Sequence, residues 1–177
     1  MKIKLCVLGL PGSGKNTVGE LLKTNYPNVD ICDVGSALRQ RAEADKHIKD
    51  THKEGGLVSS DRVMGIFEEY LAKDEWILLG SPRRPNEAQW ILDGNSDPGY
   101  LVYLKVPYEV AKQRLLSRGR FDDTEEVISR RFADFETYTM KSIELYQEAN
   151  RLIEVDATRS PEEIVLDIRA KLLDVTY

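Results

Sequence analysis

The chain has 177 residues, 41% of them hydrophobic, which is enough for one compact domain with a proper core. Its 25 lysines and arginines are outnumbered by 30 aspartates and glutamates, so the net charge is −5. This balance argues against general binding to nucleic acids or anionic membranes, because both need a basic surface. The sequence has neither 18 consecutive apolar residues nor an apolar signal segment after Met1, so we expect no membrane insertion and no secretion.

The cysteine content points to a reducing compartment. The two cysteines, Cys6 and Cys32, both lie inside apolar runs. We expect buried free thiols rather than a disulfide, and a cytoplasmic protein.

Five short apolar runs alternate with helical stretches along the chain. The predicted strands are Ile3–Leu10, Val29–Val34, Trp76–Leu79, Tyr100–Val106 and Leu152–Val155. A long helical segment without glycine or proline carries Val127, Phe135 and Tyr138 on its apolar positions. Alternating strands and helices predict a parallel sheet covered on both faces, a three-layer α/β/α architecture with a five-stranded parallel sheet.

No repeat or linker divides the sequence, so we expect a single domain over residues 1–177. Two stretches interrupt the strand-helix pattern. Residues 36–64 are polar and helical and form a predicted cap over the sheet edge, while residues 117–124 form a short charged turn. Both are expected on the side where the strands end, where open α/β sheets bind their ligands.

The sharpest local motif is the glycine-rich stretch from Gly9 to Thr17, between the first predicted strand and the first predicted helix. Glycines allow the backbone to turn several N–H groups toward phosphate oxygens, the helix adds its positive dipole end, and Lys15 adds a full charge. The motif therefore predicts a nucleotide phosphate site. The residue after the lysine, usually Ser or Thr, is Asn16, and the hydroxyl comes one position later at Thr17.

The pattern Gly-x-Pro-Gly-Ser-Gly-Lys-x-Thr resembles the loop of adenylate kinases and other nucleoside monophosphate kinases, and the rest of the chain follows the family in order. The resemblance implies ATP as phosphoryl donor, with Mg²⁺ as cofactor and Thr17 as its ligand. The donor-binding residues that it implies are Gly12, Ser13, Gly14, Lys15, Asn16, Thr17, Arg114, Arg118 and Thr158.

Three further segments resemble the family's acceptor site. Val34 to Arg39 is similar to Thr-Gly-Asp-Leu-Leu-Arg, Gly55 to Val58 to the segment beside the acceptor base, and Gly80 to Arg83 to Gly-Phe-Pro-Arg. The acceptor-binding residues implied are Val34, Gly35, Arg39, Val58, Gly80, Arg83, Glu87 and Gln89.

The segment around Arg118-Gly119-Arg120 is similar to the short lid of the family, which has no room for the zinc-binding insertion of other members, so we expect no zinc. The catalytic residues implied are Lys15, Arg83, Arg120 and Arg131. Phosphoryl transfer needs alignment and positive charge around the transferred group, and the guanidinium fork of arginine suits that work. Arg114 and Arg118 share one helix face.

Four positions depart from the family pattern. Val34 stands where adenylate kinases usually have Thr, and Glu87 where they have Gln, so the acceptor base stays open. Leu79 and Ser36 replace the two aspartates expected near magnesium. With Thr17 and Asp33 as the remaining nearby oxygen groups, we predict weaker retention of Mg²⁺.

The other charged residues receive local interpretations. We assign Arg41, Arg84, Arg130 and Arg159 to the solvated surface. Asp123 is predicted to cap a helix, with Glu126 three residues later, and to orient the lid arginines only secondarily.

The sequence thus predicts a monomeric P-loop kinase that transfers the γ-phosphoryl group of ATP to a nucleoside monophosphate, with AMP preferred. Two alternatives remain: a kinase for CMP, UMP or another small acceptor such as shikimate, and a regulatory protein that binds nucleotide without turnover. The missing carboxylates favour the second alternative, whereas Arg39 and Arg83 argue against it, since a binder of ATP alone needs no second phosphate site.

Overall fold

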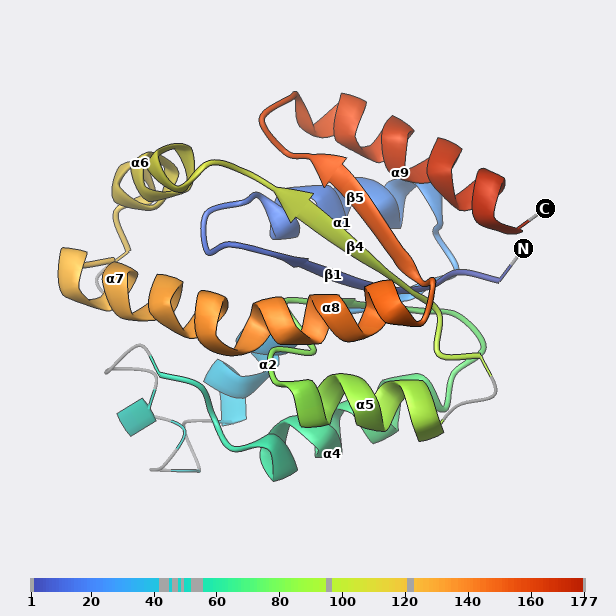
Figure 1. Ribbon diagram of the computed structural model, residues 1–177, viewed down its shortest axis with the longest axis horizontal. Helices are drawn as coiled ribbons and strands as arrows, with labels where there is room; N and C mark the ends of the chain where they lie inside the picture. Colours follow the sequence, from blue (N-terminus) through green and yellow to red (C-terminus); the bar gives the residue numbers. More distant parts are fainter. Residues whose placement is uncertain are drawn as a thin grey trace.

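One sheet of five parallel strands organises the molecule, in the order β2-β3-β1-β4-β5 (Figure 1). The computed structural model describes residues 2–41, 45, 48, 50–51, 56–94, 97–120 and 123–176. Each strand matches its predicted apolar run to within one residue at either end. The strands are β1 (Lys4–Gly9), β2 (Asp30–Asp33), β3 (Trp76–Leu79), β4 (Tyr100–Lys105) and β5 (Leu152–Asp156).

Helices occupy the connections between the strands, as the alternation predicted. Their bounds are α1 (Lys15–Asn25), α2 (Val34–Arg41), α4 (Ser60–Leu71), α5 (Pro85–Gly94), α6 (Tyr108–Arg118), α7 (Glu125–Asp134), the π-helix η1 (Phe135–Thr139), α8 (Met140–Glu148) and α9 (Pro161–Thr176).

Two apolar clusters cover the two faces of the sheet. In β1, Leu5 and Val7 pack with α1 and α9, while Cys6 and Leu8 belong to the cluster that includes α2, α4, α5 and α8. Successive side chains of a strand point to opposite faces, so a strand covered on both sides is apolar throughout. Figure 1 shows α9 above the sheet and α5 and α8 below it, which confirms the predicted three layers.

The strand ends are aligned by the register of the sheet. Leu79 at the end of β3 pairs with Val7 of β1 on one side and with Asp33 of β2 on the other. Residues that follow these strands therefore meet at a single edge, where the phosphate loop also begins.

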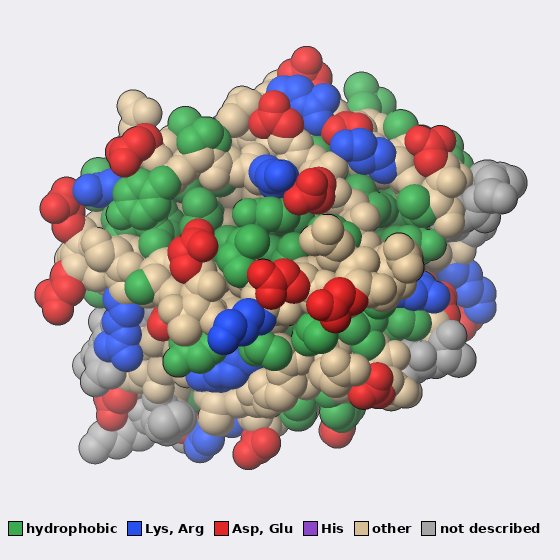
Figure 2. Space-filling model, in the orientation of Figure 1, with side chains coloured by type: hydrophobic (Ala, Val, Ile, Leu, Met, Phe, Trp, Pro, Cys, Tyr) green, Lys and Arg blue, Asp and Glu red, His purple; other side chains and the backbone are tan. Residues whose placement is uncertain are grey.

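Both cysteines are buried and free, as expected. Burial raises the pKa of the Cys6 thiol to about 12, against the opposing effect of its contact with the Tyr146 hydroxyl, so Cys6 is an inert core residue. None of the described helices is long and apolar enough to span a membrane. Acidic and basic side chains are interspersed on the face shown in Figure 2.

The long predicted helical segment contains a π-helical turn that its periodicity did not predict. η1 joins α7 to α8, and it buries Phe135 and Thr139 while Tyr138 is exposed. The expectation that Tyr138 faces the core is therefore wrong. The wider turn changes the helix face that points inward, because a π-helix adds a residue to the i→i−4 spacing.

Candidate active site

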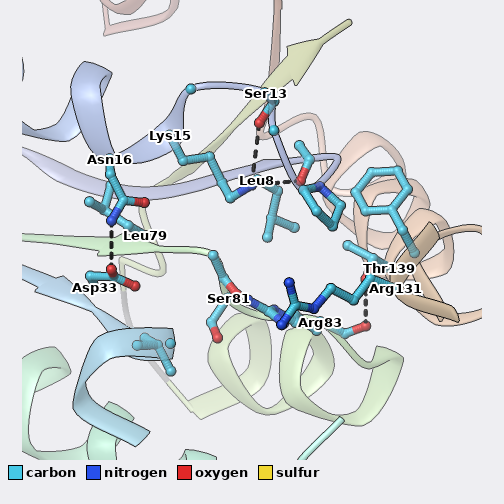
Figure 3. A pocket seen from close by; sticks show the side chains of 18 of the residues that line it. Leu8, Ser13, Lys15, Asn16, Asp33, Leu79, Ser81, Arg83, Arg131 and Thr139 are labelled. Atoms are coloured by element: carbon cyan, nitrogen blue, oxygen red, sulfur yellow. Dashed lines mark hydrogen bonds between the residues drawn. The ribbon is translucent and has the colours of Figure 1, made fainter. Parts of the chain in front are cut away.

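A pocket of about 1010 Å³ opens at the carboxyl ends of β1, β2 and β3. The phosphate loop and α1 border it on one side, and α2, α5, α7 and the end of α6 contribute the other walls (Figure 3). Its volume is at the upper end of small-molecule sites, which typically measure about 300–1,000 Å³. The pocket lies on the side of the sheet where the sequence predicts the ligand site.

Two glycines give the phosphate loop its shape. Gly12 and Gly14 have φ values of 87° and 89°, in the left-handed region that other residues rarely adopt. A Cβ on Gly12 would lie 2.4 Å from the carbonyl oxygen of Ala111, so α6 packs directly on the loop. A Cβ on Gly14 would meet no atom within 4 Å, and α1 begins at the next residue. The unpaired N–H groups of the first turn of α1 thus form the end of an anion cradle.

Lys15 is folded back onto the loop. Its Nζ donates to the carbonyl oxygens of Gly9 at 2.9 Å and Leu10 at 3.0 Å, and to Ser13 Oγ at 3.3 Å (Figure 3). Burial, together with the nearby charge of Arg83, lowers the pKa of Lys15 to about 7, although Asp33 opposes the shift. A phosphate in the loop would restore the protonated form.

Two arginines face Lys15 across the pocket from α2 and from the end of β3. The Arg83 Nε donates to the Gly80 carbonyl at 2.7 Å, and its backbone carbonyl accepts from Thr139 Oγ1 of η1 at 3.2 Å. Arg39 lies 3.7 Å from the carboxylate of Asp33. Burial lowers the pKa of Arg83 from its ordinary value, although Glu87 and Asp33 oppose the shift. The two arginines form a second cationic group, separate from the phosphate loop.

A third cationic group comes from the end of α6 and from α7. Arg118 Nε and Nη2 each donate to Asp123 at 2.8 Å, and Arg131 Nη1 donates to the same carboxylate at 3.2 Å. Burial alone would raise the pKa of Asp123, but the two arginines hold it below its ordinary value. Arg120 follows the left-handed Gly119 that ends α6, and it also lines the pocket.

The predicted capping role of Asp123 is wrong. Thr124 is the N-cap of α7, and its side chain accepts from the N–H of Val127. Both carboxylate oxygens of Asp123 instead accept hydrogen bonds from Arg118, and one of them also accepts from Arg131. The contact with the lid arginines, predicted only as a secondary role, is therefore the one observed.

Glu87 lines the pocket, but its carboxylate already accepts hydrogen bonds from neighbouring residues. It is 1% exposed, and Oε2 accepts from the N–H groups of Arg83 at 2.8 Å and Arg84 at 3.3 Å, while Oε1 accepts from Ser60 Oγ at 3.1 Å. Pro85 occupies the first position of α5 and Glu87 the third, which is the arrangement of a capping box without its Ser or Thr cap.

The surface assignment of Arg84 is wrong. Its guanidinium donates to the backbone carbonyls of Leu57 and Val58, and the side chain lines the pocket. Sequence periodicity does not reveal a guanidinium that connects a loop to the start of α5, so this role of Arg84 was missed. Arg159 also lines the pocket, and it pairs with Asp167 of α9.

Most predicted site residues converge on this pocket, and two do not. The residues brought together are Gly12, Ser13, Gly14, Lys15, Asn16, Thr17, Val34, Gly35, Arg39, Val58, Gly80, Arg83, Glu87, Arg114, Arg118, Arg120 and Arg131. Gln89 is instead exposed on α5 and donates to Asp93, and Thr158 lines a separate shallow cavity beside β4 and β5. In place of Thr158, Ala157 lines the main pocket, and its carbonyl accepts from Arg114 at 3.0 Å.

The described residues include no cluster of three His, Cys, Asp or Glu side chains suited to a metal. Mg²⁺ needs no such cluster, because it keeps several waters and binds largely to substrate phosphates. Thr17 and Asp33 are oxygen donors at the pocket wall, and they fit an ion held in that way. Leu79 contributes no oxygen, since it is buried against α1, where a Cβ on Gly19 would lie 2.4 Å from Leu79 Cδ1.

Comparison with known proteins agrees with this geometry. Residues 7–151 match the family model described as adenylate kinase. An adenylate kinase of Prochlorococcus marinus is 35% identical, over 97% of this chain and 100% of that protein. Adenylate kinase 1 of Nostoc sp. is 32% identical over 96% of this chain and 98% of its own length, and adenylate kinase 1 of Synechocystis sp. is 33% identical over 93% and 94%. The chain belongs to the adenylate kinase family.

Proposed function

We propose that this protein transfers the γ-phosphoryl group of ATP to AMP and releases two molecules of ADP. One observation carries the proposal: the phosphate loop with Lys15 and the pair Arg39 and Arg83 open into the same pocket from different walls. A protein that only binds ATP needs the first group, whereas transfer between two nucleotides needs both. The names of its relatives support AMP as the acceptor.

On the donor side, the loop from Gly12 to Thr17 would hold the ATP phosphates with its N–H groups. Lys15 would follow the transferred group, and Arg118, Arg120 and Arg131 would surround it. Little covalent chemistry is required of the protein, so alignment and positive charge around the transferred oxygens supply the catalysis. Arg114, which donates to the Ala157 carbonyl, would border the adenine.

On the acceptor side, Arg39 and Arg83 would grip the phosphate of AMP. The apolar wall and glycine backbone beside them would contact the rest of the nucleotide, and the residues proposed for it are Val34, Gly35, Val58, Gly80 and Glu87. Because the Glu87 carboxylate already accepts hydrogen bonds from Arg83, Arg84 and Ser60, we propose that Glu87 shapes this wall.

We further propose that the chain acts as one domain and as a cytoplasmic monomer. The predicted cap over residues 36–64 and the lid over 117–124 would close over the bound nucleotides and exclude water, which would otherwise accept the phosphoryl group. Of these segments, residues 42–44, 46–47, 49, 52–55 and 121–122 lie outside the described residues. Mg²⁺ would enter with ATP and neutralise charge on its phosphates, with Thr17 as its protein ligand.

Formation of ADP tests the proposal. Purified protein is given ATP and Mg²⁺ with AMP, CMP, UMP, GMP or dTMP in turn, and we expect turnover with AMP. Lys15→Ala should lower kcat by at least about a hundredfold, as the loss of a group that stabilises transition-state charge does. Turnover with another acceptor alone would reassign the substrate, and binding of ATP without turnover would make the protein a non-catalytic nucleotide binder.

A further inference from the structure

The end of β3 leaves the phosphate site without a carboxylate. Leu79 is 4% exposed and packs with α1 and α9 in the apolar cluster on that face. Ser36, the other position where the family resemblance predicts an aspartate, is a neutral residue of α2. An Mg²⁺ ion beside the loop would therefore receive no negative charge from Leu79 or Ser36.

Asp33 places a carboxylate one strand away, at the same level of the sheet. It is the register partner of Leu79 in the β2-β3 pair, and neighbouring strands lie about 4.8 Å apart. Cys32 belongs to the cluster on the opposite face, so Asp33 and Leu79 both point toward α1. Figure 3 shows Asp33 below Asn16, on the side of Lys15 away from Arg131.

The carboxylate of Asp33 is fixed by three partners and still reaches the pocket. Oδ2 accepts from Asn16 Nδ2 at 2.6 Å and lies 3.7 Å from Arg39 Nη2, while Oδ1 accepts from the N–H of Ser36 at 3.2 Å. Its side chain is 24% exposed, and it lines the pocket. Four lone-pair sites are available to a carboxylate, so it retains capacity for water.

The other acidic residues of the pocket wall are occupied or displaced. Among the described residues that line it, the carboxylates are Asp33, Glu87 and Asp134. Glu87 accepts from the backbone of Arg83 and Arg84, and Asp134 ends α7 on the side of the lid arginines. Asp33 alone of the three is hydrogen-bonded to the phosphate loop, through Asn16.

We propose that Asp33 replaces the missing β3 carboxylate by accepting hydrogen bonds from the waters of the Mg²⁺ ion that accompanies ATP. Asn16 would then hold the Asp33 carboxylate in position, because its side-chain amide donates to Asp33 at the end of β2. The inference rests on the proposed function, because it requires ATP in the loop. Asp33 is a positioning residue here, and it acts on the metal through water.

Binding of Mn²⁺, a paramagnetic substitute for Mg²⁺, measures this role without turnover. Free Mn²⁺ is followed by electron paramagnetic resonance in titrations of the complex with ATP, with protein in excess over ATP so that little unbound ATP competes for the ion. Asp33→Asn keeps the side-chain shape and the N-cap of α2, because Asn caps as well as Asp does. We expect it to weaken Mn²⁺ retention about tenfold, as the loss of an outer-sphere partner typically does. Asp33→Ser, also a good N-cap, provides a second variant.

The matched control is Asp30→Asn, the same change on the same strand at an exposed position that pairs with Lys73. It should leave Mn²⁺ retention unchanged. Unaltered retention in Asp33→Asn, with a raised KM for AMP, would overturn the proposal and reduce Asp33 to an anchor for Arg39. Failure of the unaltered protein to bind ATP in the presence of Mg²⁺ would instead refute the proposed function itself, and this inference with it.

Discussion

Lys15 is the residue whose charge is most sensitive to the ligand. Burial and Arg83 bring its pKa to about 7 in the free protein, so at pH 8 most of its amine is neutral. A bound polyphosphate favours the charged form, so ATP binding takes up a proton. The affinity for ATP should accordingly fall as pH rises from 7 to the raised pKa that Lys15 has in the complex. Above that second pKa the affinity should level off.

Calorimetric titration with ATP at pH 8, in two buffers of different ionisation enthalpy, measures that proton. We expect uptake of about one proton per ATP, since the pKa of one group crosses the working pH. Lys15→Ala should remove the buffer dependence. Equal binding enthalpies in both buffers for the unaltered protein would show that Lys15 is already charged before ATP binds.

Asp123 should affect both catalysis and stability. Its side chain is 1% exposed and joins Arg118 to Arg131, so Asp123→Asn frees two arginines from the geometry that transfer requires. We expect kcat to fall about tenfold to a hundredfold, because misplaced groups lose alignment. A buried polar group that loses a partner costs about 1–3 kcal/mol of the free energy of unfolding.

Asp97→Asn is the control for this change, because Asp97 also pairs with an arginine, Arg151, but does not line the pocket. Steady-state kinetics and thermal unfolding separate the two effects. The lowered pKa of Asp123 means that its stabilisation is present above the pKa of the unfolded chain and disappears as pH falls through the folded value. Unchanged kcat in Asp123→Asn would remove it from the active site.

Among the elements, the π-helical turn η1 connects α7 to Arg83, for which we propose an acceptor-binding role. Thr139 Oγ1 donates to the carbonyl of Arg83, and Arg131 lies on the helix just before the turn. Thr139→Val keeps the shape and removes the donor, so the protein should lose about 1 kcal/mol of stability. Without this hydrogen bond the backbone of Arg83 is held less firmly, and the side chain proposed to bind the AMP phosphate is less well positioned. We expect the KM for AMP to rise several-fold with little change in the KM for ATP.

Thr137→Val in the same turn is the matched control, because Thr137 is exposed. Its kinetics and melting temperature should equal those of the unaltered protein. Equal effects of the two substitutions on the KM for AMP would mean that the change does not come from the hydrogen bond to Arg83.

What the sequence could predict at this scale follows from periodicity. A strand such as Trp76–Leu79 is apolar on both faces, and its neighbours are glycine and charged residues, so its bounds were predicted as observed. The turn at Phe135–Thr139 was missed because its residues fit an ordinary helix as well as a π-helix. Asp123 was misassigned for a similar reason: Thr124 beside it caps equally well, and only the fold brings Arg131 within reach.

Site residues were predictable where the backbone itself makes the site. The phosphate loop needs glycines at fixed spacing, which the sequence displays. Arg84 was not predictable, because its role depends on the carbonyls of Leu57 and Val58, more than 25 residues away. Gln89 failed as a candidate because it lies on the exposed face of α5.

For the whole molecule, the two phosphate sites proposed for one pocket predict tight binding of a ligand that spans them. Two adenosines joined by five phosphates would reach the proposed donor and acceptor sites at once, so the entropy of ordering the ligand would be lost once for both sets of contacts. At a thousandfold excess over its Kd, such a ligand stabilises the folded state by about 4 kcal/mol, or roughly 10 °C in Tm for a chain of this length.

Thermal unfolding with ATP, AMP and the bridging dinucleotide at equal concentration checks this expectation. The dinucleotide should raise Tm well above the shift given by ATP, and Arg83→Ala should reduce its effect to that of ATP, because the acceptor end loses its phosphate clamp. The same Tm shift for the dinucleotide and ATP in the unaltered protein would mean that Arg39 and Arg83 do not form a second nucleotide site. The phosphate loop would then be the sole anchor, and the chain would bind one nucleotide at a time.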